Sequence, residues 1–413
     1  MRRLAALPLA LLALAPRAVV AQDERPAAGA AATAIRAFTA DLLRSVAADG
    51  GNLFVSPTSI ALALAMTRAG AAGATAAQMD AALHLPQDAA AAFRDLSAAL
   101  ADVPTVRQPD EAGGRTQVPA YVLSIANGLF SQEGWAFSDA FRATIADAYR
   151  AELRTLDFRA SPAARDAINA WVEKHTADKI KNIVPEGLPT PDTRMVLANA
   201  IHFLASWDEP FRESETRDAP FTVAPGSEVT AKLMHRTARL AYAETDDAQV
   251  VALPYVRGAT AMIVVLPRAK DGLDALVRSL TPERLAEWTG ATGVRKVAVA
   301  LPRFSFTTPL TLGPVLRRLG IVDAFDGGKA DFTGITKEKP FFVGEVLHKA
   351  FVAVDEKGTE AAAATVVMIR AGSAPRPEEP VPFVVDHPFL FVLVHRTTGT
   401  PLFVGRVVDP TRS

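Results

Sequence analysis

The spacing of apolar residues changes along the chain, and this change limits the fold more than any other feature. Up to about residue 180 the apolar residues recur with helical periodicity, and from Met195 onward strand-like runs dominate. Helices first and strands later indicate the α+β class. Because no linker interrupts residues 35–410 and 49% of the 413 residues are hydrophobic, we expect one large domain with a sizeable core.

The two kinds of run have recognisable ends. Ser56 can cap a helix, Pro57 suits its first position and Gly70 can end it. The expected helices span residues 35–46, 56–69, 75 onward, 89–100, 137–149, 163–179, 273–280, 282–288 and 310–319. The expected strands span residues 195–203, 250–255, 259–266, 297–306, 341–354, 388–394 and 402–408.

The N-terminus has the pattern of a signal peptide over residues 1–21. Two arginines precede an apolar stretch, and small residues stand three and one before a cut after Ala21. The stretch is shorter than the roughly 20 residues of a spanning helix, and the alternative is a buried N-terminal helix. We expect a secreted or periplasmic protein with no membrane attachment after signal cleavage. Residues 22–33 are expected to be a flexible, Ala/Gly-rich leader, followed by the domain over 34–413.

Charge and cysteine content exclude several classes of partner. The 44 Lys and Arg residues nearly balance 45 Asp and Glu residues, so the formal net charge is -1 and we expect no nucleic acid as partner. Cysteine is absent, which excludes a disulfide framework and a thiol nucleophile.

Motifs of catalysis are absent from the sequence. It contains no G-x-S-x-G, H-E-x-x-H, G-x-x-x-x-G-K-[ST] or G-x-G-x-x-G pattern, and its seven histidines have no metal-ligand spacing. Asp386 and His387 come nearest to a dyad, but they precede a strongly apolar strand, which favours a structural hydrogen bond. We therefore expect no enzyme, no metal and no cofactor, with a hydrolase of unknown motif as a distant alternative.

The segment from Val354 to Pro380 connects two strand-like runs and is unusually long. Strand connections are normally two to five residues, and longer ones are usually functional or disordered. At period two, Thr359 shares one face with small and apolar residues, whereas Glu360 and Arg370 share the other. Such a strand could enter a sheet with its charges toward solvent, and Gly358 would serve as its hinge.

A helix is the alternative for this segment. Four consecutive alanines, Ala361–Ala364, favour a helix by propensity. The β-branched residues that follow, and a cluster of prolines further on, disfavour any helix longer than two turns.

The residues from Glu356 to Thr365, which read EKGTEAAAAT, resemble the reactive-loop hinge of inhibitory serpins. The resemblance extends over nearly the whole mature chain. It includes the segments NLFVSPTSI (52–60), GAAGAT (70–75), ANGLF (126–130), INAWV (168–172), LANAIHF (197–203), LPY (253–255), ADF (330–332), HKA (348–350) and DHPFLF (386–391).

The resemblance implies a single large domain with three β-sheets, about eight or nine helices and an exposed reactive-centre loop over about 356–380. It implies hinge residues at Glu356, Gly358, Thr359, Glu360, Ala361, Ala362, Ala363 and Ala364. It also implies a region that controls opening of the main sheet at Ser56, Ser59, Asn199, Trp207 and His348. Without the resemblance, Ser56 could be only a helix cap and His348 only a core histidine. Serpins typically have Gly two residues before the tryptophan, where this chain has Ala205.

The resemblance further implies an irreversible, suicide-type inhibitor of serine endopeptidases, or of cysteine endopeptidases, that forms a covalent complex with its target. The cut loop would insert as a strand into the main sheet, and the protein would be a monomer. Counting from Glu356 places the cut bond at Gly372-Ser373, with Arg370-Ala371 as the alternative. A non-inhibitory carrier or chaperone of the same family is the other interpretation.

Overall fold

The computed structural model describes residues 26–47, 50–109, 115–149, 151–290, 293–338, 340–360 and 378–412. Several predictions lie outside these residues. They are the signal peptide, the start of the leader, the hinge alanines Ala361–Ala364 and both candidate cut bonds between 370 and 373.

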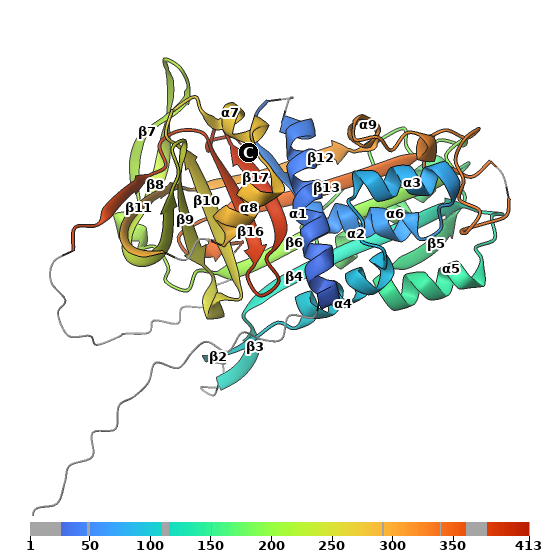
Figure 1. Cartoon of the computed structure of the whole chain (residues 1–413), viewed down its shortest axis with the longest axis horizontal. Coiled ribbons are helices and arrows are strands. Elements are labelled where there is room, and N and C mark those ends of the chain that lie inside the picture. Colours follow the sequence, from blue (N-terminus) through green and yellow to red (C-terminus); the bar gives the residue numbers. More distant parts are fainter. Residues whose placement is uncertain are drawn as a thin grey trace, which may run out of the picture.

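The largest sheet has nine strands and curves through one half of the molecule (Figure 1). Its neighbours pair antiparallel, apart from the parallel pair β11–β15. In spatial order the strands are β1 (Leu53–Val55), β17 (Thr400–Val407), β16 (Phe389–His395), β10 (Thr260–Pro267), β9 (Ala248–Pro254), β8 (Ser227–Glu244), β11 (Val294–Pro302) and β15 (Val381–Val384), with β7 (Arg217–Ala224) beside β8.

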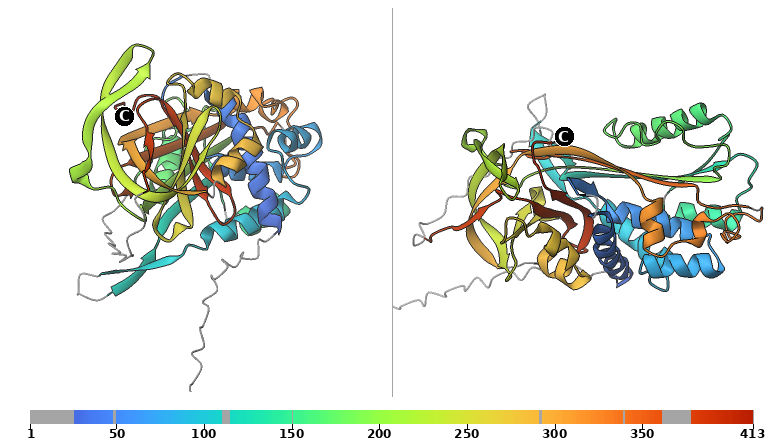
Figure 2. Two further views of the ribbon diagram at one scale, coloured as in Figure 1. Left: turned by 60° about the vertical axis from the view of Figure 1, so that its left-hand side comes forward. Right: turned by 90° about the horizontal axis from the view of Figure 1, so that it is seen from above.

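The six-stranded sheet runs along the length of the molecule and carries the site described below. Its central strands, β6 and β13, are parallel to each other, and the two-residue strand β14 lies between their ends. In spatial order the strands are β12 (Phe304–Thr311), β13 (Glu345–Val354), β14 (Gly358–Thr359), β6 (Met195–Ser206), β4 (Tyr121–Gln132) and β5 (Glu152–Leu156). A separate two-stranded ribbon, β2 (Thr105–Pro109) and β3 (Arg115–Pro119), projects from the body (Figure 2).

Nine α-helices surround these sheets within the described residues. They are α1 (Pro26–Val46), α2 (Pro57–Arg68), α3 (Gly73–Ala82), α4 (Ala89–Ala101), α5 (Asp139–Thr144), α6 (Ser161–His175), α7 (Leu273–Arg278), α8 (Pro282–Thr289) and α9 (Gly313–Arg318). The right-hand view of Figure 2 shows α6 alone on one face of the six-stranded sheet, with the other helices beneath the opposite face. Among the described helices, none is long and apolar enough to cross a membrane. These observations confirm the α+β class.

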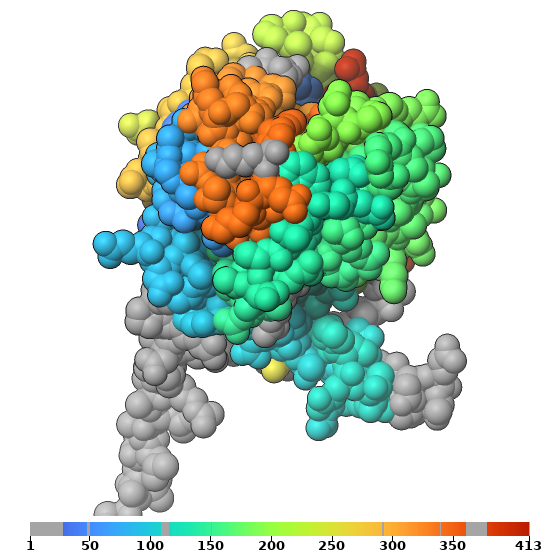
Figure 3. Space-filling view, turned by 90° about the vertical axis from the view of Figure 1, so that its right-hand side faces the viewer, coloured from blue at the N-terminus to red at the C-terminus, as the bar shows by residue number. Residues whose placement is uncertain are grey.

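The end of the molecule farthest from β7 is closed by packed segments that are distant in sequence (Figure 3). There the segment after α9 lies between α3 and α5. The backbone N–H of Gly334 donates to the carbonyl of Gly70 at 3.1 Å, and Ser138 donates to the carbonyl of Ile335 at 2.8 Å. A Cβ on Gly334 would lie 2.8 Å from the oxygen of Gly70, so this close approach requires glycine.

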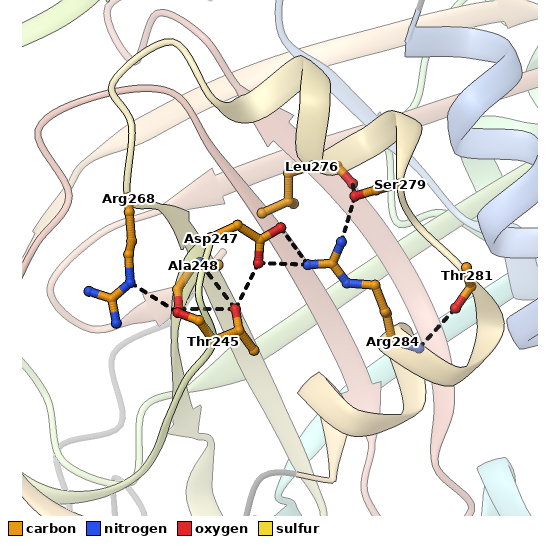
Figure 4. A network of polar contacts seen from close by, with 8 residues as sticks. All are labelled: Thr245, Asp247, Ala248, Arg268, Leu276, Ser279, Thr281 and Arg284. Carbon is orange, nitrogen blue, oxygen red and sulfur yellow. Dashed lines mark hydrogen bonds and ion pairs between the residues drawn. The ribbon is translucent and has the colours of Figure 1, made fainter.

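Polar contacts join the helical layer to the nine-stranded sheet at the turn between β8 and β9 (Figure 4). Arg284 of α8 donates to both carboxylate oxygens of Asp247, at 2.9 and 2.8 Å. Its guanidinium also lies 4.9 Å from the ring centre of Trp288. Burial raises the pKa of Asp247, but the bonds from Arg284 and Thr245 outweigh this and lower it. The contact therefore fixes α8 against the sheet.

The expectation of a flexible leader is wrong for residues 26–33, because α1 already begins at Pro26. Ala31 and Ala32 are fully buried. Alanine favours helix, and its small side chain lets a helix pack closely against its neighbours. The run of small residues is therefore a packing surface rather than a linker.

Strand assignments differ at several points. The expected strand 297–306 is two strands, β11 and β12, which belong to different sheets and are separated by Arg303. The expected strand 341–354 begins only at Glu345. The helix-patterned first part also contains β4, which pairs with β6 along eleven residues from Tyr121 to Ser131. Its second half shows no alternation, because from Gly128 onward every residue of the strand is buried and both faces are covered.

Candidate functional site

The hinge begins as a short strand between β13 and β6. Gly358 and Thr359 pair antiparallel with Ser206 and Ala205 of β6, and Thr359 also pairs with Val354 of β13. The first two residues of the hinge strand thus already lie in the middle of the six-stranded sheet.

Gly358 is required by the close approach of β6. A Cβ at this position would lie 2.1 Å from the carbonyl oxygen of Ala205, which no side chain can occupy. A tight turn precedes it, because the Asp355 carboxylate accepts bonds from the N–H groups of Lys357, at 2.8 Å, and Gly358, at 3.1 Å. The glycine predicted as a hinge is therefore a close-contact position.

Thr359 is buried, and its hydroxyl forms a hydrogen bond of 2.5 Å with the hydroxyl of Tyr255. Tyr255 is fully enclosed, and this burial raises the pKa of its hydroxyl. The ring of Tyr255 stacks on that of Trp207, with 4.6 Å between centroids and 7° between planes. The side chain of Thr359 therefore points inward, as expected, and Tyr255 contacts it there.

Trp207 holds the turn that leads into β14. Its indole Nε1–H donates to the carbonyl of Asp355 at 2.9 Å, and its backbone N–H donates to the carbonyl of Lys357 at 2.9 Å. The predicted position of Trp207, next to the hinge at the end of β6, is thus observed. Ala205, where serpins typically have Gly, is accommodated with 1% exposure.

Glu356 forms an ion pair at the same end of the sheet. The side chain is 4% exposed, and its Oε1 accepts a bond of 2.6 Å from Arg303 Nε and another from the hydroxyl of Thr216. Burial raises the pKa of Glu356, but the bonds from Thr216 and Arg303 outweigh this, so the pKa lies below its usual value. The carboxylate is therefore charged at neutral pH and fixes the start of the hinge.

Glu360 is the last hinge residue that the structure describes, and it differs from expectation. Its side chain is 2% exposed rather than solvated, and its carboxylate contacts His202 of β6. Its φ of 49° is in the left-handed region, so the chain leaves the strand direction here. The hinge strand therefore ends at Thr359.

A second polar cluster lies further along the same two strands. Asn199 of β6 is directly opposite His348 of β13, and the His348 Nδ1–H donates to the Asn199 side-chain oxygen. The Asn199 amide in turn donates to Ser59 and to Asn127. The backbone N–H of Ser56 donates to His348 Nε2 at 3.2 Å. The structure therefore brings together four of the five residues predicted for sheet opening and adds Asn127, whereas the fifth, Trp207, lies at the hinge.

His348 is neutral in this cluster. Burial lowers its pKa from 6.5 to about 3. Both ring nitrogens are used, one as donor and one as acceptor, which assigns a single tautomer. Ser56 also caps α2, as predicted, because its hydroxyl accepts from the Ser59 N–H at 3.1 Å. Separation of β6 from β13 must break the bond between His348 and Asn199.

Several residues of the site were not singled out from the sequence. Asn127 and Tyr255 lie inside segments that carry the resemblance, so their side chains could have been examined. His202 also lies inside such a segment, but it is a lone histidine in a strand-like run, and Arg303 is a lone charge between two apolar runs. Only the pairing of strands shows what these two contact.

Asp386 and His387 form no catalytic pair with a free ring nitrogen. His387 Nδ1 contacts Asp386 at 2.7 Å, and Nε2 donates to the carbonyl of Pro267 at 2.7 Å. The structural hydrogen bond expected before the strand is therefore observed. In the part of the chain that the structure describes, no group of three His, Asp or Glu residues could hold a metal ion.

Comparisons with known proteins agree with this geometry. Residues 33–410 match the model of the family described as Serpin (serine protease inhibitor). The leukocyte elastase inhibitor of Sus scrofa is 38% identical over 386 residues, covering 90% of this chain and 97% of the relative. An uncharacterised serpin-like protein of Thermococcus kodakarensis is 37% identical over 379 residues, covering 91% of this chain and 85% of the relative.

Solved structures share the fold over almost the whole chain. Serpin48 of the insect Tenebrio molitor superposes with a TM-score of 0.78 at 29% identity, covering 94% of this chain and 99% of that structure. The thermophilic serpin tengpin in its native state superposes with a TM-score of 0.79 at 28% identity, covering 94% and 95%. With sequence, fold and hinge geometry in agreement, this chain belongs to the serpin family.

Proposed function

We propose that this protein is an irreversible inhibitor of serine endopeptidases, with cysteine endopeptidases as a second target class. It would act by cleavage of the segment 356–380 and insertion of the cut strand between β6 and β13. The position of β14 carries this proposal. Gly358 and Thr359 occupy the first two positions of such a strand, so the cut loop has a template to extend.

The directions of the strands favour insertion. β6 and β13 are parallel, whereas β14 is antiparallel to both. An inserted strand would therefore replace one parallel pair by two antiparallel pairs, which are slightly more stable per residue. A new strand of about twelve residues, at about 1 kcal/mol net per hydrogen bond, rivals the whole stability of a domain. The uncut form would then persist because its conversion is slow.

The chemistry would belong to the protease. Its nucleophile attacks the carbonyl of the bait bond, the new amine leaves with a proton, and the loop stays attached as an acyl ester. The loop then inserts and carries the protease with it, as in serpins generally. Insertion must be faster than hydrolysis of the ester. We propose accordingly that the chain is not an enzyme, that it acts as an exported monomer, and that its bait lies at Gly372-Ser373 or Arg370-Ala371.

The first experiment mixes the purified protein with elastase-like, trypsin-like and subtilisin-like proteases. We expect a complex with at least one of them that resists boiling in denaturant. The mass of the released C-terminal fragment identifies the cut bond and separates Gly372-Ser373 from Arg370-Ala371. If every protease merely cleaves the loop and remains active, inhibition is wrong, and the carrier or chaperone interpretation becomes the better one.

A variant tests strand insertion directly. Thr359→Arg places a charge on the buried face against Tyr255, where no side chain in the site pairs with it. We expect cleavage without a stable complex. Lys357→Arg, two residues earlier on an exposed side chain, is the matched control and should inhibit normally. Unchanged inhibition by Thr359→Arg would count against insertion.

A further inference from the structure

The six-stranded sheet has a fork between β6 and β13. In the described residues, the two strands pair directly as far as Ile201 and Ala350, whereas β14 separates them at Thr359. The stretch of β6 from His202 to Leu204 therefore lines a gap that one more strand would fill. We call this gap the fork.

The side chain of Glu360 lies in the fork. Its backbone N–H donates to the carbonyl of Ala353 on β13 at 2.8 Å, while its Oε2 contacts Nε2 of His202 on β6. Both side chains are almost fully buried, with 2% and 5% exposure. Glu360 thus bridges the two strands at the point where they separate.

The segment after α6 adds a second contact on the same carboxylate. Lys179 Nζ lies 3.9 Å from Glu360 Oε2, and its side chain is 46% exposed. Nearby, Lys349 of β13 donates to the carbonyl of Lys181 at 2.8 Å. This segment continues from α6, which covers this sheet in the right-hand view of Figure 2. The Glu360 carboxylate therefore contacts β6 through His202 and the segment after α6 through Lys179.

The contact between Glu360 and His202, which we call the bridge, leaves one polar atom of each side chain without a hydrogen bond among the residues that the structure describes. Within the described residues, Glu360 Oε1 and His202 Nδ1 have no hydrogen-bond partner. A buried polar atom without a partner costs free energy, and a buried ion pair gains little unless its remaining atoms are bonded. A contact of this kind holds its partners in place but does not make the closed state deeply stable.

The strand register requires Glu360 to turn before the loop can insert. Extending the antiparallel pair of Thr359 and Ala205 places Glu360 opposite Leu204 and the residue two positions later opposite His202. At present the Glu360 carboxylate itself contacts His202, in the place where that later residue would lie. Its φ of 49° must also change to a strand value near −140°. The fork cannot fill with a strand while the bridge holds Glu360 in this turned conformation.

We infer that His202 is a positioning residue that holds Glu360 in the fork and thereby delays insertion of the reactive loop, with Lys179 as a weaker second anchor. The inference rests on the proposed function, because it names the contact that gates that insertion. It assigns a role to a histidine that neither caps a helix nor belongs to the cluster around Asn199.

The test measures spontaneous insertion without any protease. The uncut protein is held at a fixed elevated temperature, and samples are assayed for the fraction that has acquired resistance to urea. We expect His202→Phe, which removes the bond but keeps an aromatic ring, to convert about tenfold faster, as for loss of one charge-assisted hydrogen bond. His202→Gln keeps a donor and should convert within about threefold of the wild-type rate.

A double-variant comparison separates the contact from general loosening. Glu360→Ala should also convert about tenfold faster, and adding His202→Phe to it should give no further acceleration. Lys357→Ala, an exposed hinge neighbour, is the matched control and should convert at the wild-type rate. A wild-type rate for His202→Phe, or multiplication of the two single effects, would overturn the inference.

A milder variant covers the case in which His202→Phe does not fold. Lys179→Met changes a half-exposed side chain and should convert about twofold faster, since exposed ion pairs are weak; a wild-type rate would contradict the inference. Because the assay needs no protease, the two proposals fail separately. If the variants convert faster but the protein traps no protease, only the proposed function is wrong. If the protein traps a protease but the variants convert at the wild-type rate, only this inference is wrong.

Discussion

The centres of the two large sheets differ in composition. In the nine-stranded sheet every residue of β10, β16 and β17 is buried, and most are apolar. Phe54 stacks on Phe403 with 4.7 Å between the rings. In the six-stranded sheet the central strands β6 and β13 meet through Asn199 and His348, and further along they separate around Glu360.

The difference teaches how one domain can combine a permanent part with a part that opens. An apolar antiparallel core gains free energy from packing alone and offers no alternative partners. Buried polar groups are directional, so the bonds of His348 and Asn199 can be broken and remade one at a time. The following predictions test this contrast, from the largest expected effect to the smallest.

Truncation in the apolar sheet should cost the most. Phe391→Ala removes a fully buried ring that stacks 5.7 Å from Phe54. We expect a loss of about 3–5 kcal/mol in the free energy of unfolding, from lost burial and the cavity left behind. Urea denaturation followed by circular dichroism measures it. A loss below about 1 kcal/mol would mean that this sheet is not the rigid half.

Truncation in the polar cluster should cost less and act on opening. Asn199→Ala leaves His348, Ser59 and Asn127 without a shared partner. We expect a loss of about 1–3 kcal/mol, since each unsatisfied buried group carries such a penalty. Conversion of the uncut protein to the urea-resistant form should also accelerate, unlike in Phe391→Ala. Equal acceleration in both variants would break the comparison between the sheets.

The pH dependence of stability should differ when His348 is removed. Its pKa is about 3 when folded against 6.5 ordinarily, so the unfolded chain binds a proton that the folded one refuses. Its contribution to stability is complete above pH 6.5 and falls progressively toward pH 3. Between pH 6 and pH 5 this amounts to about 1 kcal/mol.

The measurement compares urea midpoints at these two pH values. His348→Gln should lose about 1 kcal/mol less than the wild type over the interval. His395 of the nine-stranded sheet, whose pKa burial lowers to about 4, adds a dependence of the same sign in both proteins. Identical pH profiles for wild type and His348→Gln would contradict burial of an uncharged His348.

Loss of a single hydroxyl at the hinge should have the smallest effect. Thr359→Val keeps the shape but removes the bond to Tyr255. We expect a loss of about 1 kcal/mol or less in the free energy of unfolding, with protease trapping retained, because valine is tolerated inside a sheet. Thermal melting and the gel assay for complexes measure the two effects. Abolished trapping would show that the hydroxyl, and not only the uncharged surface, is needed.

Much of the architecture could be predicted from the sequence. The cap and end of α2, the strands around β6, β10 and β16, and the α+β class follow from periodicity and local turn chemistry. The errors have physical causes. Ala31 and Ala32 look like a linker because alanine is small and featureless, and the second half of β4 lacks alternation because both of its faces are covered. Arg303 interrupts what appears to be one strand, although β11 and β12 belong to different sheets.

The features of the site can also be separated into those that the sequence could predict and those that it could not. The alternation of residues 359–370 was sufficient to predict a strand with Gly358 as its hinge, because alternation and the absence of bulky groups are local properties, and the hinge over 356–364 was implied by the resemblance to serpins. The sequence could not show that Glu360 is buried against His202 or that Arg303 pairs with Glu356. The partners in each contact are more than fifty residues apart and meet only through strand pairing.

The sequence by itself therefore predicted that this segment can be a strand. The tertiary structure decided where that strand begins and where it stops. It begins at Gly358 because the backbone of Ala205 leaves no room for a side chain. It stops after Thr359 because Glu360 turns into the fork, and that turn depends on β6 and β13 being held apart at one end and joined at the other.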